Sequence, residues 1–290
     1  MLSPAKINLF LRIVGRRPDG YHDLETVMVA LDFGDEITLQ RRDTGLTLEC
    51  DHPDLPTDDS NLALRAAKAL AQSCQVGKGV HILLRKRIPL ASGLGGGSSN
   101  AATVLQGLNR FWGAEAPAAT LAELADGMGS DINFFLGTGA AVCRGRGEQV
   151  EPVPCRLSAA VLLVNPGFGI PSKWAYQTWS QMGEKAAKLT GPPPPVSLLV
   201  RALAENDLAA VSRALFNDLE APALRKFPVL AMLKQALIAQ GAAGAMMSGS
   251  GATVFGLFAD APTAENAAGH IREEFGPSMW TQATKLVTVE

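Results

Sequence analysis

The stretch IPLASGLGGGSSNAATVL, residues 88–105, constrains the fold of this chain more than any other. Its glycines, Gly93 and 95–97, lack a Cβ atom, so the backbone can bend sharply and a ligand can approach the amides. An apolar strand pattern precedes the stretch and a helical pattern follows it. This order is typical of a loop that binds phosphates, because the N–H groups at the start of a helix attract anions. The alternative reading of a glycine-rich segment alone is a flexible linker or a tight turn.

The glycine stretch differs from two better-known nucleotide-binding patterns. No Gly-Lys-Ser/Thr follows it, so it is not a Walker loop. Ser98 stands where a dinucleotide-binding fingerprint has its third glycine, and the chain lacks an early strand-loop-helix start. A dinucleotide-dependent oxidoreductase is therefore disfavoured.

Composition excludes several other classes of protein. The 290 residues carry a formal net charge of −2, whereas a nucleic-acid-binding protein usually has a strongly basic face. No apolar run reaches the roughly 18 residues of a transmembrane helix, and the N-terminus lacks the order of a secretory signal. The four cysteines form no Cys-x-x-Cys pair and are expected to be buried thiols. We therefore expect a cytoplasmic protein with no nucleic-acid or membrane partner.

Apolar periodicity predicts a mixed chain in which strands concentrate before residue 165 and helices after it. The run GPPPP, residues 191–195, can continue neither a helix nor a sheet and is expected to be an exposed connection. These features predict an α+β fold in two lobes, divided into residues 1–155 and 156–290. Strands are expected at 6–14, 24–40 with a break at 33–35, 45–50, 79–85 and 159–166, and helices at 61–74, 100–113, 121–129, 196–241 and 265–275.

Two further stretches place small residues around possible chemistry. SGSGATVFGLF, residues 248–258, is a glycine-serine turn that enters a strand. It is either a plain hairpin loop or a segment that closes over the same phosphates. GMGSDINFFLGTGAA, residues 127–141, places a single acid, Asp131, between glycines and an apolar run. Asp131 either caps a helix or accepts the proton of an attacking hydroxyl, as phosphoryl transfer requires.

The segments PAKINLFLRIVGRRPDGYH, PLASGLGGGSSNAA, GSDINFF and SGSGATVF together resemble the motifs of the GHMP kinases, in that family's order. The glycine stretch is common to the superfamily, whereas PAKINLFL followed by GYH at a fixed spacing is more specific. It resembles the branch that phosphorylates the 2-hydroxyl of 4-diphosphocytidyl-2-C-methyl-D-erythritol, a cytidyl diphosphate alcohol of the non-mevalonate isoprenoid pathway. The resemblance implies a ribosomal protein S5 domain 2-like N-terminal lobe, which binds ATP, and a ferredoxin-like C-terminal lobe.

The resemblance also implies the catalytic residues. Asp131 matches the family's catalytic acid and would be the general base. Lys6 matches the lysine beside that acid; its ammonium would keep Asp131 ionised and stabilise charge on the transferred group. The family usually has proline two residues after the acid, whereas this chain has Asn133, which restores an N–H and frees φ.

The substrate residues follow in the same way. Tyr21 and His22 match the pair that recognises cytosine, the tyrosine by stacking and the histidine by hydrogen bonding. Tyr176 matches a second stacking ring, for which Phe168 and Trp174 are alternatives. The remaining substrate contacts that the resemblance implies are Asn8 and Ser172.

ATP is expected in the glycine stretch, with Mg²⁺ carried by its phosphates and no strong protein ligand for the metal. A second glycine-serine turn, Ser248, Gly249, Ser250 and Gly251, would close over the phosphates. The ATP-binding residues implied are Asn61, Pro89, Leu90, Ala91, Ser92, Gly93, Leu94, Gly95, Gly96, Gly97, Ser98, Ser99 and Asn100.

Two other functions remain open at this point. Another GHMP kinase, acting on mevalonate or a phosphorylated relative, would not need Tyr21, His22 and a second aromatic ring. A non-catalytic sensor on the same fold would have lost Lys6 or Asp131, and this chain has both. We therefore expect a kinase with a small-molecule substrate, acting as a monomer or homodimer.

Overall fold

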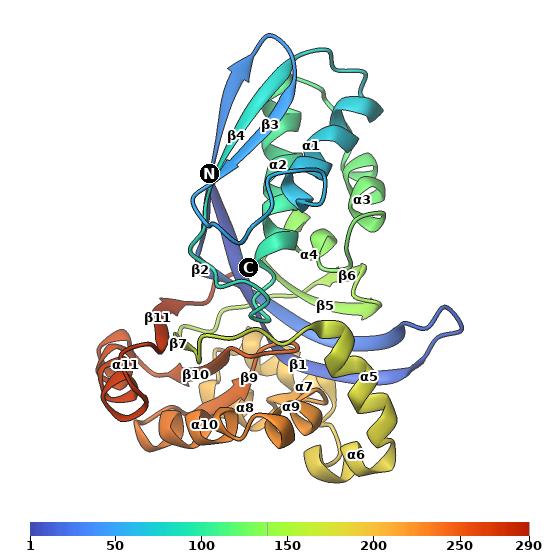
Figure 1. Cartoon of the computed structure of the whole chain (residues 1–290). Helices are drawn as coiled ribbons and strands as arrows, with labels where there is room; N and C mark the ends of the chain where they lie inside the picture. The colour runs from blue at the N-terminus through green and yellow to red at the C-terminus, as the bar shows by residue number, and fades with distance from the viewer. Residues whose placement is uncertain (138, 290) are drawn as a thin grey trace.

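A long antiparallel pair of strands, β1 (Leu2–Arg16) and β2 (His22–Arg42), joins the upper and lower parts of the molecule in Figure 1. The structure is a computed structural model that describes residues 1–137 and 139–289. The pairing of β1 with β2 shifts on both sides of Lys6–Asn8, between Pro4 and Lys6 and between Asn8 and Phe10. Bulges of this kind bend a strand and change the direction of its side chains. Lys6, Ile7 and Asn8 therefore form a short paired stretch of β1 between two bulges.

The expected break at residues 33–35 is wrong, because β2 continues through it. Gly34 pairs with Pro4 of β1, and a Cβ atom at Gly34 would lie 2.1 Å from the carbonyl oxygen of Ser3. The glycine permits a close approach of two strands and does not mark a turn.

The upper lobe is built on a mixed sheet with strand order β3-β4-β2-β1-β8, where β8 is Phe216–Asn217 from the second half of the chain, and β5 and β6 are added through β2. Helices cover one side of this sheet, with α2 against β1 and β2 and α1 between α2 and β3 (Figure 1). Buried aliphatic side chains such as Ile37, Leu84 and Leu105 fill the space between helices and sheet. The elements are β3 (Leu46–Cys50), α1 (Leu62–Ser73), β4 (Gly79–Arg85), α2 (Gly96–Trp112), α3 (Ala118–Asp126), α4 (Ile132–Leu136), β5 (Ala140–Gly145) and β6 (Gln149–Pro152).

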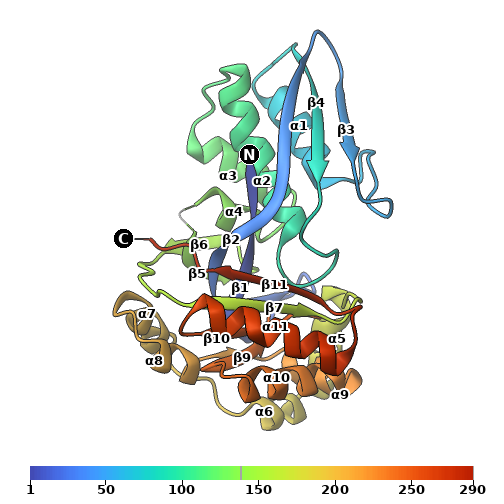
Figure 2. The same ribbon diagram turned by 90° about the vertical axis from the view of Figure 1, so that its left-hand side faces the viewer.

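The lower lobe is built on an antiparallel sheet of β7 (Ala160–Asn165), β9 (Gly244–Met247), β10 (Val254–Phe258) and β11 (Trp280–Lys285). Its strand order is β11-β7-β10-β9. Two helices, α10 (Val229–Ala239) and α11 (Ala261–Phe275), lie on one face of it (Figures 1 and 2). The order of strands and helices is that of a ferredoxin-like unit, as expected.

The helical stretch expected over residues 196–241 contains a short strand, β8 (Phe216–Asn217). It lies parallel to β1, with Phe10 opposite Phe216 and Leu11 opposite Asn217. Two residues are too few to show a strand period, so the sequence pattern missed it. The helices that precede β8 in this half of the chain are α5 (Ser172–Met182), α6 (Glu184–Thr190), α7 (Val196–Ala204) and α8 (Leu208–Arg213), and α9 (Glu220–Lys226) follows it.

The two lobes share strands and chain ends. β8 comes from the second half of the chain but pairs in the upper sheet, and the C-terminal segment returns to form bridges from Leu286 to Leu31 and from Val289 to Cys155. The division at residue 155 stays a prediction. Within the described ranges, no helix has both the length and the apolar character needed to cross a membrane.

The expectation for cysteines and the proline run is largely confirmed. The run at 191–195 connects α6 to α7 outside any helix or strand. All four cysteines are free thiols, with Cys143 and Cys155 buried but Cys50 and Cys74 only half-buried.

Candidate active site

A cavity of about 990 Å³ is lined by segments of both lobes. Most of the residues singled out by the motifs line it. Four do not: Leu94, Ser99, Ser248 and Gly251. Those that do are Lys6, Asn8, Tyr21, His22, Asn61, Pro89, Leu90, Ala91, Ser92, Gly93, Gly95, Gly96, Gly97, Ser98, Asn100, Asp131, Ser172, Tyr176, Gly249 and Ser250.

Lys6 and Asp131 meet in this cavity although they are far apart in the sequence. Lys6 Nζ lies 3.5 Å from Asp131 Oδ2 and donates a hydrogen bond of 2.6 Å to Asn8 Oδ1. Asn8 in turn donates to Thr26 Oγ1 at 2.8 Å. The Lys6 side chain is 5% exposed and that of Asp131 is 34% exposed. A fixed, buried ammonium therefore faces a carboxylate that can still reach a ligand in the cavity.

The side chain of Asp131 does not cap a helix. Asp131 stands at the N-cap of α4 but makes no capping hydrogen bond, so its carboxylate stays directed at Lys6. Asn133, in place of the family's usual proline, donates through its side chain to Asp126 at the end of α3. This contact ties the turn that carries Asp131 to the neighbouring helix.

The glycine stretch forms a left-handed turn and the first turn of α2. Gly93 has φ 82° and Gly95 has φ 73°, a region that favours glycine. A Cβ at Gly93 would lie 2.1 Å from the Ser248 carbonyl oxygen, and one at Gly95 would lie 3.0 Å from the Lys6 side chain. No side chain caps the helix at Gly95, so the N–H groups of the first turn are available to an anion.

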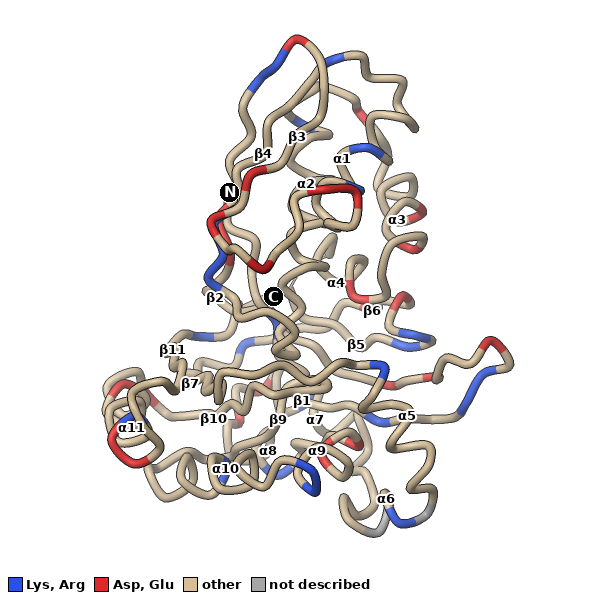
Figure 3. The backbone as a smooth tube through the Cα atoms, in the orientation of Figure 1, with Lys and Arg blue, Asp and Glu red and all other residues tan. Residues whose placement is uncertain are grey.

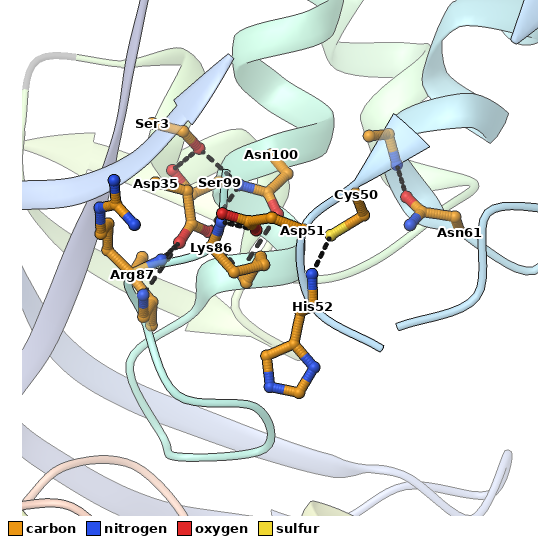
Figure 4. A network of polar contacts seen from close by, with 12 residues as sticks. Ser3, Asp35, Cys50, Asp51, His52, Asn61, Lys86, Arg87, Ser99 and Asn100 are labelled. Carbon is orange, nitrogen blue, oxygen red and sulfur yellow. Dashed lines mark hydrogen bonds and ion pairs between the residues drawn. The ribbon is translucent and has the colours of Figure 1, made fainter. Parts of the chain in front are cut away.

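The helix begins at Gly96, and the expected start at Asn100 is wrong. Asn100 lies one turn inside α2, where its amide donates to Ser3 Oγ and Asp35 Oδ2, each at 2.9 Å. Ser99 is fully buried and bonds to Ser3 Oγ at 2.8 Å. These two side chains support the turn from behind, as Figure 4 shows.

A buried ion pair that the motifs did not indicate lies at the centre of the same network. Lys86 contacts the carboxylate of Asp35, and their side chains are 5% and 0% exposed. Asp35 also accepts from the backbone N–H groups of Arg87 and Ile88, at 2.7 Å and 2.9 Å (Figure 4). This pair ties β2 to the segment that leads into the glycine turn. In the sequence, the only signal for this ion pair was an acid, Asp35, directly after Phe-Gly in a strand pattern.

The second glycine-serine turn packs directly on the first. Ser248 Oγ donates to the Gly93 carbonyl oxygen at 3.0 Å, and the N–H of Asn8 donates to Ser248 Oγ at 3.4 Å. Asn217, which none of the sequence motifs indicated, holds this turn. Its side-chain amide donates to the carbonyl oxygens of Met247 and Gly249, each at 2.8 Å. Asn217 lies on β8 beside β1, so one short strand connects the turn with the strand that carries Lys6.

Aromatic rings also line the cavity. The rings of His22 and Tyr176 stack with centroids 5.3 Å apart and an angle of 20° between their planes. Phe168 and Trp174 pack on Phe227, so among the three candidate rings only Tyr176 lines the described cavity. Tyr21 is 58% exposed beside them. The cavity therefore offers both the stacked rings of His22 and Tyr176 and the exposed ring of Tyr21.

The titration of the two stacked rings reflects their surroundings. Burial, and to a lesser extent the charge of Arg16, lowers the pKa of His22. Burial also raises the pKa of Tyr176 above its usual range. His22 Nε2 lies 2.7 Å from Ser180 Oγ on α5. A neutral imidazole with one nitrogen bonded to a hydroxyl can use its other edge to recognise a neutral base.

Two of the expected contacts shape the rim of the cavity. Asn61 caps α1 by accepting from the N–H of Ala63 at 2.9 Å, and it donates to the Pro56 carbonyl oxygen at 2.8 Å. The hydroxyls of Ser172 and Ser250 lie 3.0 Å apart and connect α5 with the second glycine-serine turn. Each therefore lines the cavity while holding a loop in place.

Comparison with known proteins shows the family to which this chain belongs. The family model GHMP kinases N terminal domain matches residues 61–141, and GHMP kinases C terminal matches residues 199–277. A protein of Synechococcus sp. (strain JA-3-3Ab) named 4-diphosphocytidyl-2-C-methyl-D-erythritol kinase is 42% identical, over 92% of this chain and 87% of its own length. One of the same name from Geobacter metallireducens is 40% identical, over 92% of this chain and 91% of its own.

Solved structures of GHMP kinases also share the fold of this chain. The crystal structure of a 4-(cytidine 5'-diphospho)-2C-methyl-D-erythritol kinase matches with a TM-score of 0.84 and 34% identity, over 100% of this chain and 99% of its own. The L. major mevalonate kinase matches with a TM-score of 0.76 at 16% identity, over 99% and 96%, which shows a shared fold. This chain belongs to the GHMP kinases, and within them to the 4-diphosphocytidyl-2-C-methyl-D-erythritol kinase family.

Proposed function

We propose that this ATP-dependent kinase transfers the γ-phosphoryl group of ATP to the 2-hydroxyl of 4-diphosphocytidyl-2-C-methyl-D-erythritol. The observation that carries the proposal is the composition of one cavity, which is lined by the Lys6–Asp131 pair, by a glycine turn and by the stacked rings of His22 and Tyr176. The glycine turn suits a triphosphate, the rings suit a pyrimidine, and the pair suits the hydroxyl that is phosphorylated.

Asp131 acts as the general base in this proposal. Its carboxylate accepts the proton of the substrate hydroxyl while the bond from that oxygen to the γ-phosphorus forms and the bond from the γ-phosphorus to the ADP oxygen breaks. Lys6 is held by Asn8 at 2.6 Å, so its charge is fixed near the transferred group before the substrate arrives. Such pre-set charge stabilises a transition state without reorganisation.

The glycine turns hold the phosphates of ATP. The N–H groups at the start of α2, at 96–98, point toward an anion at the positive end of a 17-residue helix. Ser98 lines the cavity and adds a hydroxyl donor. The turn at 248–251 packs on Gly93 and would close over the same phosphates.

Mg²⁺ is proposed to arrive on ATP. In the part of the chain that the structure describes, no three His, Cys, Asp or Glu side chains gather as a metal site. Activity as a monomer or homodimer in the cytoplasm also stays a prediction.

Release of ADP by the purified protein tests the proposed function. Mg²⁺-ATP is offered with the cytidyl diphosphate alcohol, mevalonate, homoserine or galactose in separate reactions. Turnover with the cytidyl compound alone supports the proposal. Turnover with mevalonate would favour the alternative, a GHMP kinase for another small alcohol, and would exclude a cytosine-binding role for Tyr21 and His22.

A further inference from the structure

Arg146 lies in the turn between β5 and β6, where it lines the active-site cavity without a role in the motifs. Figure 3 shows basic positions at this turn, beside the outer end of the β1–β2 hairpin. The guanidinium carbon of Arg146 lies 5.4 Å from the centre of the Tyr21 ring. Arg146 is thus a cation at the aromatic end of the cavity.

The backbone of the same turn lies beside the reaction centre. Gly147, the next residue, is buried against Asp131, and a Cβ there would lie 3.5 Å from Asp131 Oδ1. Arg146 therefore starts next to the proposed base and extends its side chain to the proposed stacking ring.

The cations that line the cavity differ in whether a carboxylate already pairs with them. Lys6 is engaged with Asp131, and Lys86 with Asp35. Among the side chains that the structure describes, which leave out that of residue 184, Arg146 has no carboxylate within ion-pair distance, and Asp19, which also lines the cavity, pairs with Arg17. Lys173, which lines the cavity at the start of α5, also has none but is exposed. A guanidinium without a paired carboxylate is suited to an anionic ligand, which it can bind through two parallel N–H donors.

We propose that Arg146 binds the diphosphate of the cytidyl substrate. The inference rests on the proposed function: with the hydroxyl at Asp131 and cytosine at Tyr21, the diphosphate that connects them must pass between the two. Arg146 occupies that interval from the side of the β5–β6 turn. The residue then contributes to specificity, because an alcohol without a diphosphate leaves the guanidinium without its partner.

The test compares two ligands that differ only in the diphosphate. Affinities of CDP and cytidine are measured by calorimetry on the wild type and on Arg146→Ala, with a melting curve for each protein. A charged hydrogen bond contributes about 1.5–3 kcal/mol, so we expect CDP to bind roughly 10- to 100-fold more weakly to Arg146→Ala. Cytidine affinity should change less than about twofold, and Arg146→Lys should recover part of the loss, because a lysine keeps the charge without the fork.

A neighbouring arginine provides the matched control. Arg144 is on the same hairpin, but it pairs with Glu25 and Glu151 and does not line the cavity. Arg144→Ala should leave the ratio of CDP to cytidine affinity unchanged. An equal loss of CDP and cytidine in Arg146→Ala would overturn the proposal, and so would a loss of CDP affinity confined to Lys173→Ala.

The same experiment separates this inference from the proposed function. If the wild type releases ADP with the cytidyl substrate and binds CDP more tightly than cytidine, while Arg146→Ala binds CDP as the wild type does, only the role of Arg146 fails. If the wild type shows neither turnover nor CDP binding, the proposed function fails and the inference fails with it.

Discussion

Replacement of Lys86 by methionine tests whether the buried ion pair stabilises the site. The lysine contacts Asp35, and both side chains are almost fully buried. Loss of one partner from a buried pair costs about 3–5 kcal/mol, because the remaining charge has no compensation. Asp35 keeps three N–H donors, from Arg87, Ile88 and Asn100, so we expect the lower end of this range.

Lys86→Met should therefore lower the free energy of unfolding by about 3 kcal/mol, which is roughly a hundred-fold in the unfolding equilibrium. Urea unfolding followed by circular dichroism measures the change, with an unaltered m-value as evidence that the unfolded state is the same. The control is Lys68→Met, because Lys68 and Asp59 form an exposed pair of the same type. An exposed pair contributes about 0–1 kcal/mol. Equal losses in the two variants would refute the reasoning.

Three other predictions follow from the site. Asp131→Asn should lower turnover at least 100-fold, since a positioned general base contributes a rate factor of about 10²–10⁴. The affinity for ATP, measured by calorimetry, should stay within about twofold. Turnover near the wild-type rate would exclude Asp131 as the base. Asn217→Ala removes the donor of the Met247 and Gly249 carbonyls, at a cost of about 1–3 kcal/mol for each. Urea unfolding should show this loss, and turnover at a temperature where the variant is folded should fall; Asn109→Ala, which also removes two side-chain bonds to backbone but far from the cavity, should affect stability alone. Because burial lowers the pKa of His22 below its ordinary 6.5, the unfolded chain binds this proton more readily, and the free energy of unfolding should decrease as the pH falls below about 6.5. His22→Gln should show a shallower decrease between pH 7.5 and 5, and identical pH profiles would contradict the expected sign.

Local sequence patterns predicted much of the fold because they depend on neighbouring residues. The alternation in β1 and the glycine turn before α2 were visible in the sequence, since both follow from side-chain periodicity and from the absence of Cβ atoms. The unbroken course of β2 was not predicted. Gly34 looks like a turn residue locally, and only the backbone of β1 beside it shows why glycine is required there.

The residues of the candidate site divide in the same way, into those that sequence motifs indicate and those that they do not. Lys6, Asp131, the glycine turn and the Tyr21–His22 pair could be named from motifs, because each motif is continuous in sequence. Motifs could not indicate Asn217, the Lys86–Asp35 pair or Arg146, because each contacts a partner far along the chain. Asn217 contacts the turn after β9, Lys86 contacts Asp35 on strand β2, and Arg146 contacts Tyr21 at the end of the β1–β2 hairpin.

The sequence by itself thus determined the local elements and the chemistry that this protein carries. Only the tertiary structure decided which side chains meet. Ser99 and Asn100 show the difference, since the resemblance implied that both belong to an ATP-binding stretch, and packing directs their side chains at Ser3 and Asp35. The physical reason is that a hydrogen bond or an ion pair depends on distances of about 3 Å, and for segments remote in sequence these distances are fixed only when strands and helices pack into a common core.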